Sequence, residues 1–134
     1  MYNLQIVKEK LYSTDASLVV VYSNGECKEY YQNRINDIKE ILKENREALQ
    51  GAIIADKVIG KVAGSILTVA GVKEIYADVM SKYAITVLDK NNIRYEYRNL
   101  VNYVQNNEKT GMCPMESKYK EESDINKIYN DLIM

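Results

Sequence analysis

The chain of 134 residues carries 18 basic and 19 acidic side chains, so its net charge is −1. This balance argues against nucleic acid as a partner, because proteins that bind phosphate backbones normally carry a basic excess or stripe. No apolar run approaches the roughly 20 residues that span a bilayer, and the N-terminus has no apolar signal segment. We therefore expect a cytoplasmic protein without a membrane partner, in which Cys27 and Cys113 remain thiols.

The first 30 residues predict a short helix followed by a β-hairpin. Helical spacing of apolar side chains indicates the helix at Leu4, Val7 and Leu11. Residues 18–22 (LVVVY) are typical of a buried strand, and the more polar residues 26–30 suit a strand at the sheet edge. Between these strands, Asn24 and Gly25 form the dipeptide that best supplies the positive φ angles of a two-residue hairpin turn.

The middle of the chain predicts two helices and two strands in alternation. Apolar residues at helical spacing mark a second helix at Ile35, Ile38, Ile41, Leu42 and Leu49. The same spacing marks a third helix at Val58, Ile59, Val62, Ala63, Ile66, Leu67 and Ala70. Gly71 stands where this helix is expected to end. Residues 52–55 and 74–79 predict strands that flank the third helix.

The last third of the chain predicts one further strand among helices. A fourth helix contains Ala84, Val87 and Leu88. Residues 94–98 (RYEYR) alternate in polarity, as a half-exposed strand does. Residues 100–104 predict a helix that leads into a loop. The terminal helix contains Ile125, Ile128, Tyr129 and Leu132.

The order of these elements predicts the fold class. Right-handed crossovers make the last three strands parallel, with helices on both faces of the sheet. We expect an α/β protein, a three-layer α/β/α sandwich whose mixed sheet has about five strands: an N-terminal antiparallel hairpin plus parallel strands. No repeat or linker divides the sequence, so residues 1–134 are expected to form one domain with a core at about 18–132.

Three segments resemble one family. Residues 55–63 (ADKVIGKVA), 71–79 (GVKEIYADV) and 110–116 (TGMCPME) together look like the domain-of-unknown-function family 1893. The resemblance covers nearly everything between residues 18 and 132. It implies a cytidine-deaminase-like fold, and it implies no particular reaction, because none is established for the family.

The sequence lacks the zinc site of true deaminases. Those enzymes hold zinc with a His or Cys at the start of the helix after the hairpin, and with two cysteines at the start of the next helix. Here the first position falls on residues 31–35 (YQNRI), and the second on residues 55–61, where lysines replace cysteines. The chain contains no histidine, and catalytic zinc normally has three protein ligands. Zinc-dependent deamination is therefore excluded, and no metal or cofactor is predicted.

Residues 56–61 have two interpretations. Lys57 and Lys61 are four residues apart, so on a helix they share a face, and Gly60 between them lets a group approach the backbone. With the N–H groups of a helix N-terminus, they predict a site for a phosphate or carboxylate, in which Asp56 holds a hydroxyl or amine. In the structural interpretation, Asp56 is only the N-cap of the helix and the lysines are solvated.

Residues 110–116 likewise leave two interpretations open. Pro114 favours the first turn of a helix, which places Cys113 at an N-cap where the helix dipole favours a thiolate. Glu116 then completes the cap or carries a proton, and Gly111 lets the backbone fold against a ligand. The alternative is that Cys113 is a small buried apolar residue in a structural clasp. Asp78 is a further candidate, as a wall of the same cleft or as the cap of a helix near Ser81.

Three classes of function fit these residues. The first is a binding protein for a small anionic or nucleotide-like molecule at residues 56–61. The second is a metal-independent enzyme in which Cys113 acts with Asp56, Lys57 and Lys61. The third is a non-catalytic assembly protein, with exposed tyrosines in the interface of a homo-oligomer. The sequence favours the first class, because it offers no histidine as the base that a nucleophilic cysteine needs.

Overall fold

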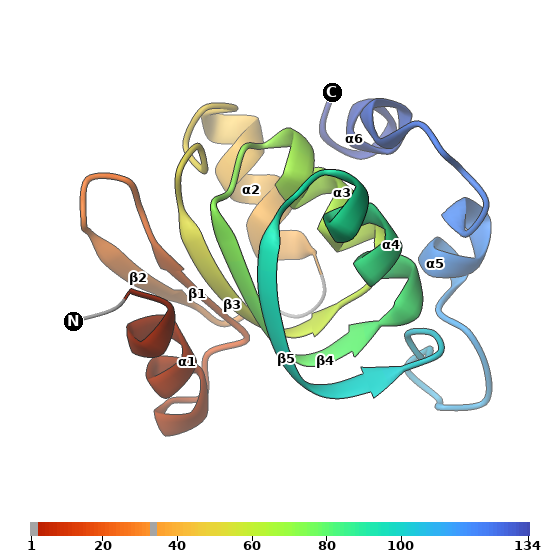
Figure 1. Ribbon diagram of the computed structural model, residues 1–134, viewed down its shortest axis with the longest axis horizontal. Helices are drawn as coiled ribbons and strands as arrows, with labels where there is room; N and C mark the ends of the chain where they lie inside the picture. Colours follow the sequence, from red (N-terminus) through yellow and green to blue (C-terminus); the bar gives the residue numbers. More distant parts are fainter. Residues whose placement is uncertain (1–2, 33–34) are drawn as a thin grey trace.

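The computed structural model describes residues 3–32 and 35–134 (Figure 1). One sheet has the order β2-β1-β3-β4-β5. Its strands are β1 (Leu18–Val21), β2 (Cys27–Tyr30), β3 (Ile53–Ile59), β4 (Glu74–Ser81) and β5 (Arg94–Val101). β1 runs antiparallel to β2 and β3, whereas β3, β4 and β5 are parallel. The predicted α/β class, with a mixed sheet of an antiparallel hairpin and parallel strands, is confirmed.

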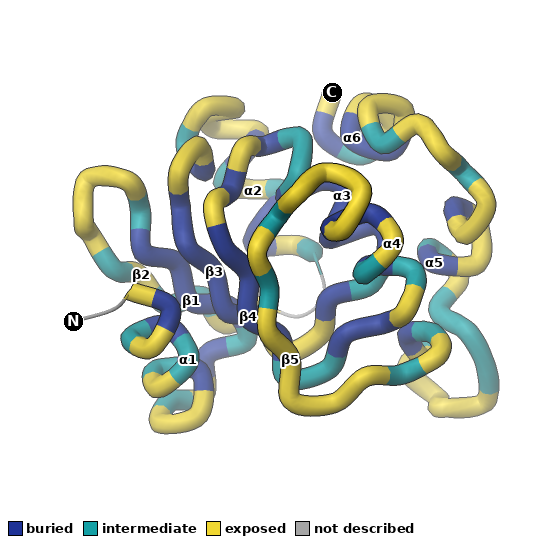
Figure 2. Tube along the Cα trace, viewed as in Figure 1, coloured by how far each residue is buried: buried dark blue, intermediate teal, exposed yellow. Residues whose placement is uncertain are grey.

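Helices pack on both faces of this sheet. They are α1 (Asn3–Ser13), α2 (Asn36–Glu44), α3 (Lys61–Val69), α4 (Lys82–Lys90), α5 (Pro114–Tyr119) and α6 (Ile125–Ile133). α1 covers one face, where it packs on Val19, Val21 and Tyr76. The opposite face carries a second core, formed by Val20 and Ile54 with helices α2, α3, α4 and α6. The two cores lie on opposite faces because neighbouring residues of a strand point to opposite sides of the sheet. Figure 2 shows the buried strands between these layers and the largely exposed β5 at one edge.

The hairpin has a different turn from the predicted two-residue one. Tyr22 N donates to the carbonyl oxygen of Glu26 at 2.8 Å, and Gly25 N donates to that of Tyr22 at 2.8 Å. Gly25 has a φ of 90°, whereas Asn24 does not have a positive φ. This is a three-residue connection with glycine in the left-handed region, a common alternative in hairpins. The predicted strands on either side are confirmed.

Two strands are longer than the sequence predicts. β3 continues through Ile59, because Val58 and Ile59 pair with Val79 and Met80 of β4. β5 continues through Val101 in the same way, and residues 102–113 then form a loop. The third helix therefore begins at residue 61 rather than near 58, and the helix predicted at 100–104 is wrong.

Two other helix predictions also change. α2 ends at Glu44, and Leu49 is buried in the turn region that follows it. α5 is a helix of six residues with Pro114 in its first turn and Cys113 at its N-cap, as Pro114 predicts. Within the described residues, no helix is both long enough and apolar enough to cross a bilayer.

Candidate functional site

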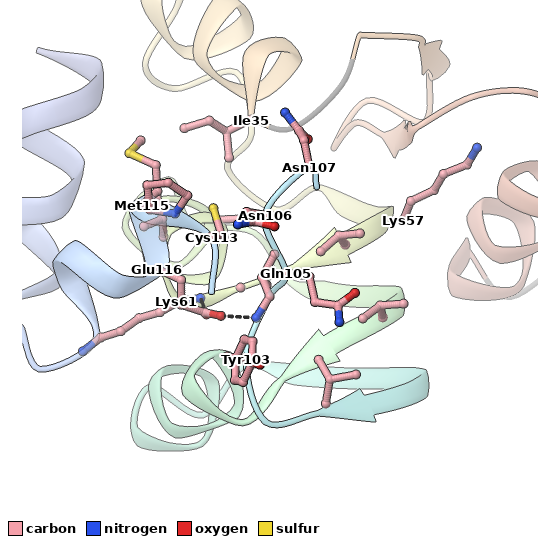
Figure 3. A pocket seen from close by; sticks show the side chains of 18 of the residues that line it. Ile35, Lys57, Lys61, Tyr103, Gln105, Asn106, Asn107, Cys113, Met115 and Glu116 are labelled. Atoms are coloured by element: carbon pink, nitrogen blue, oxygen red, sulfur yellow. Dashed lines mark hydrogen bonds between the residues drawn. The ribbon is translucent and has the colours of Figure 1, made fainter. Parts of the chain in front are cut away.

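A cleft of about 1360 Å³ lies at the carboxyl ends of the parallel strands. It is bounded by the starts of α2 and α3, by residues 102–109 after β5, and by the first residues of α5 (Figure 3). Open α/β sheets bind ligands beyond the carboxyl ends of their strands, so the cleft has the expected position for a site. The predicted site residues that line it are Asp56, Lys57, Gly60, Lys61, Cys113 and Glu116.

Asp56 is a buried carboxylate on the wall of this cleft. It lies in β3 opposite Ala77 of β4, so the predicted N-cap role is wrong. Only 6% of the residue is exposed, and its Oδ1 accepts a hydrogen bond of 3.3 Å from Val58 N. Burial raises the pKa of Asp56 from 3.8 to about 7, and the charge of Asp37 contributes to this rise. Asp56 can therefore accept or donate a proton near neutral pH.

Asp37 is a second buried carboxylate close to this wall, and sequence reasoning missed it. It lies in the first turn of α2, is 4% exposed, and accepts a hydrogen bond of 3.0 Å from Gln32 N. Burial raises its pKa as well. An acidic residue in the first turn is ordinary for a helix, because it complements the helix dipole. The sequence pattern around Asp37 therefore gives no sign that its carboxylate lies near Asp56, because the fold brings the two residues together.

The two lysines of the predicted anion site lie apart. Lys57 is exposed and belongs to β3, whereas Lys61 is buried and begins α3. Lys61 Nζ donates to the carbonyl oxygen of Lys120 at 2.9 Å, and burial lowers the pKa of this amine. Figure 3 shows the two side chains extending in opposite directions. The prediction that their ammonium groups share one helix face is wrong, because Lys57 lies on a strand.

Glu116 binds the N-terminus of α3 from within the chain. Its Oε1 accepts hydrogen bonds of 2.7 Å from Lys61 N and 2.7 Å from Ser81 Oγ, and its Oε2 accepts one from Val104 N. Ser81 in turn caps α4 by accepting from Ala84 N at 3.2 Å. The carboxylate of Glu116, only 2% exposed, thus joins the starts of two helices to the loop after β5 (Figure 3).

Gly60 makes room for this carboxylate. A Cβ at Gly60 would lie 2.7 Å from Val104 Cγ2 and 2.8 Å from Glu116 Oε1. The sequence predicts that Gly60 lets a group approach the backbone and that a ligand's phosphate or carboxylate binds the helix N-terminus. The group that approaches Gly60 is the side chain of Glu116, which accepts from Lys61 N in the position that the prediction gave to the ligand.

Cys113 lines the cleft at the N-cap of α5. Its backbone N donates to the carbonyl oxygen of Val104 at 2.7 Å, and no side-chain hydrogen bond caps the helix. Figure 3 shows Lys57 extending away from Cys113. Gly111 does not line the cleft; its carbonyl oxygen accepts from Asn106 N at 2.9 Å and closes the preceding loop.

Asp78 belongs to a different surface. Its Oδ1 accepts a hydrogen bond of 2.7 Å from the hydroxyl of Tyr12, which also lies 2.6 Å from the hydroxyl of Tyr76. Tyr12 and Tyr76 are on the α1 side of the sheet. The prediction that Asp78 forms a wall of the cleft or a cap is therefore wrong, and Ser81 caps α4 instead.

The two segments that the sequence comparison placed at a deaminase zinc site, residues 31–35 and 55–61, are only partly described. Asn33 and Arg34, in the first of them, lie outside the described residues. Among the residues that the structure describes, no group of three or more His, Cys, Asp or Glu side chains could hold a metal ion.

Comparison with known proteins establishes the family. The model of a family described as "Domain of unknown function (DUF1893)" matches residues 6–133. The chain belongs to the DUF1893 family. A crystal structure of a DUF1893 family protein from Thermotoga maritima is 26% identical, with a TM-score of 0.85, and the match covers 98% of this chain and 88% of that one. The comparison with curated proteins gave no match.

Proposed function

We propose that this DUF1893 protein binds a small anionic or nucleotide-like molecule in the cleft beside Asp56. The observation that carries the proposal is a buried carboxylate on the wall of a large cleft, where its pKa of about 7 allows it to accept or donate hydrogen bonds. Ligand sites typically combine such a group with apolar walls and a few other polar groups.

The other lining residues suit a ligand with a flat ring and a negative charge. Lys39, Lys57 and Lys109 provide cations at the rim. Apolar contact is available from Ile35, Val58, Val79, Val101 and Met115, and the cleft is also lined by the side-chain amides of Asn36, Asn102 and Gln105. Since Glu116 already occupies the N-terminus of α3, we place the ligand's anionic group at these lysines instead.

We also infer that the fold is cytidine-deaminase-like, as the family resemblance implies. The strand order and the antiparallel β1 support this inference, as does a cleft at the starts of α2 and α3. The absence of histidine from the sequence keeps the chemistry distinct from that of the zinc deaminases.

Binding without catalysis is the better-supported class. A cysteine nucleophile needs a base, and the sequence offers Lys57 and Lys61 for that role. The Lys61 amine is hydrogen-bonded to Lys120, and Lys57 extends away from Cys113. Neither orientation supports proton transfer from the thiol.

The test is a thermal-shift and calorimetric screen against nucleoside monophosphates and sugar phosphates. A ligand present at about 100 times its Kd adds about 2.7 kcal/mol of stability, which is readily seen. We expect Lys57→Ala combined with Lys39→Ala to reduce the shift. Lys73→Ala, an exposed lysine that does not line the cleft, is the matched control and should change nothing.

Two outcomes would count against this function. A screen in which no compound shifts the melting temperature would overturn the binding proposal. A ligand whose turnover is lost in Cys113→Ser would replace it with the enzyme alternative. Binding that survives Cys113→Ser, with no turnover, supports the proposal as stated.

A further inference from the structure

β5 presents an unpaired edge along eight residues. It pairs with β4 on one side, and no strand within the described residues pairs with its other side. Most of its residues are exposed, including Tyr97 and Leu100 at 40% each (Figure 2). Unpaired backbone groups along an edge of this length are a template for another strand. The opposite edge of the sheet, β2, offers only four residues.

The sequence of β5 makes the edge complementary to itself. Glu96 and Arg98 lie on the α1 face, where Lys8 Nζ is 3.8 Å from Glu96 Oε2 and Arg98 lies 5.7 Å from the centre of the Tyr12 ring. An antiparallel pair centred on Tyr97 places Glu96 of each copy opposite Arg98 of the other. Opposite charges that face each other across two strands stabilise the pair.

Other symmetric registers fit less well. Centred on Glu96, the pair brings Glu96 against Glu96 and Arg94 against Arg98, which are like charges. Centred on Tyr95, it matches Arg94 with Glu96 but leaves residues 97–101 beyond the partner strand. The register about Tyr97 uses the strand from Arg94 to Leu100 and has no like-charged pair.

We propose that β5 is the interface of a homodimer in which two copies pair antiparallel about Tyr97, joining their sheets into one. The occupant is a second copy because the charge pattern of the strand complements itself. Tyr97 meets its counterpart at the symmetry axis, and both lose exposure there. Cyclic two-fold dimers with such a self-complementary patch are the commonest oligomers. This inference does not depend on the proposed ligand.

Charge reversal tests both the interface and its register. By light scattering and sedimentation, we expect the protein to have twice the chain mass of 15.4 kDa. Glu96→Arg sets two arginines opposite each other, and Arg98→Glu sets two carboxylates opposite each other. Each single variant should increase the dimer dissociation constant by at least about tenfold.

Restoring the opposite-charge pairs, with the two residues exchanged, is the decisive experiment. The double variant Glu96→Arg/Arg98→Glu should dimerise again, and a mixture of the two single variants should form the heterodimer. Lys28→Glu reverses a charge on the edge strand β2 and should leave dimerisation unchanged. Circular dichroism and melting temperatures verify that each variant is folded.

The outcomes are separable. A wild-type protein that stays monomeric at several hundred micromolar would overturn the proposal, and a partner strand would then have to come from another protein. A dimer that is insensitive to both single variants would place the interface elsewhere. If Glu96→Arg disrupts the dimer but Arg98→Glu does not, the register about Tyr97 is wrong.

Discussion

Two buried carboxylates lie at the same end of the sheet, and their surroundings differ. Glu116 accepts hydrogen bonds from three separate parts of the chain, the starts of α3 and α4 and the loop after β5. Within residues 3–32 and 35–134, the hydrogen bonds that Asp56 accepts come from the backbone of Val58 and Lys57 in its own strand. Among the described residues, one carboxylate therefore holds separate segments together, whereas the other is bonded within its own strand.

This difference separates structural from functional roles within one cleft. A buried charge is tolerated when hydrogen bonds replace the water that it loses. For Asp56, burial outweighs the two backbone hydrogen bonds, so its pKa rises to about 7. A group with this property on the wall of a cleft is a candidate for ligand recognition. Substitutions at each carboxylate test whether the two divide the roles in this way.

The largest effect is expected for Glu116→Ala. The substitution leaves Lys61 N, Val104 N and Ser81 Oγ without their shared acceptor, and each unsatisfied buried group costs about 1–3 kcal/mol. We expect the free energy of unfolding to fall by about 3–5 kcal/mol, measured by urea denaturation. Glu121→Ala removes an exposed carboxylate nearby and should cost less than about 0.5 kcal/mol. Equal losses for both variants would contradict the role given to Glu116.

The next effect is a dependence of stability on pH that comes from Asp56. Its pKa is about 7 in the folded state and 3.8 when unperturbed, so between these values the folded state binds a proton that the unfolded state lacks. The stability from this group is therefore fully present below about pH 4 and is lost as the pH rises through 7. The loss is on the order of 2–4 kcal/mol, and Asp56→Asn should abolish it.

Unfolding measured from pH 4 to pH 8 checks this prediction, and the absence of histidine leaves few other groups that titrate near neutrality. Asp37→Asn is the informative companion, because it removes a charge that raises the pKa of Asp56. It should move the loss of stability to lower pH without abolishing it. If the slope persists in Asp56→Asn, another group is responsible.

Much of the fold could be predicted from the sequence, because buried strands and amphipathic helices have different periods. The errors occurred where both periods fit the same residues. Val58 and Ile59 extend the apolar stripe of α3 at helical spacing, yet they are β-branched residues that pair with β4. Pairing with a neighbouring strand decides such cases, and the sequence of one segment does not contain that information.

The candidate site could be predicted only as a set of segments. Residues 55–61 and 110–116 do meet, at Gly60 and Glu116, but the sequence assigned the anion position to a ligand and not to Glu116. The proximity of Asp37 to Asp56 depends on where the fold places the start of α2, and no local pattern indicates it. The short motifs of the sequence indicated which segments line the cleft, but not which of their side chains contact one another.

The smallest changes in the free energy of unfolding are expected for alanine substitutions at two glycines near the start of α3, and the two should differ. Gly60→Ala places a Cβ 2.7 Å from Val104 Cγ2 and 2.8 Å from Glu116 Oε1, so the loop or the carboxylate must shift, at a cost of about 1–3 kcal/mol. Gly64→Ala meets only the ordinary contact of 3.6 Å with Ala84 Cβ, and it removes a glycine from a helix interior. We therefore expect Gly64→Ala to be neutral or stabilising by up to about 1 kcal/mol in the same urea measurement.

Because Gly60→Ala acts through Glu116, its cost should shrink in a Glu116→Ala background, whereas the effect of Gly64→Ala should be the same in both backgrounds. Additive losses for Gly60→Ala and Glu116→Ala would show that the glycine is needed for some other reason than the carboxylate beside it.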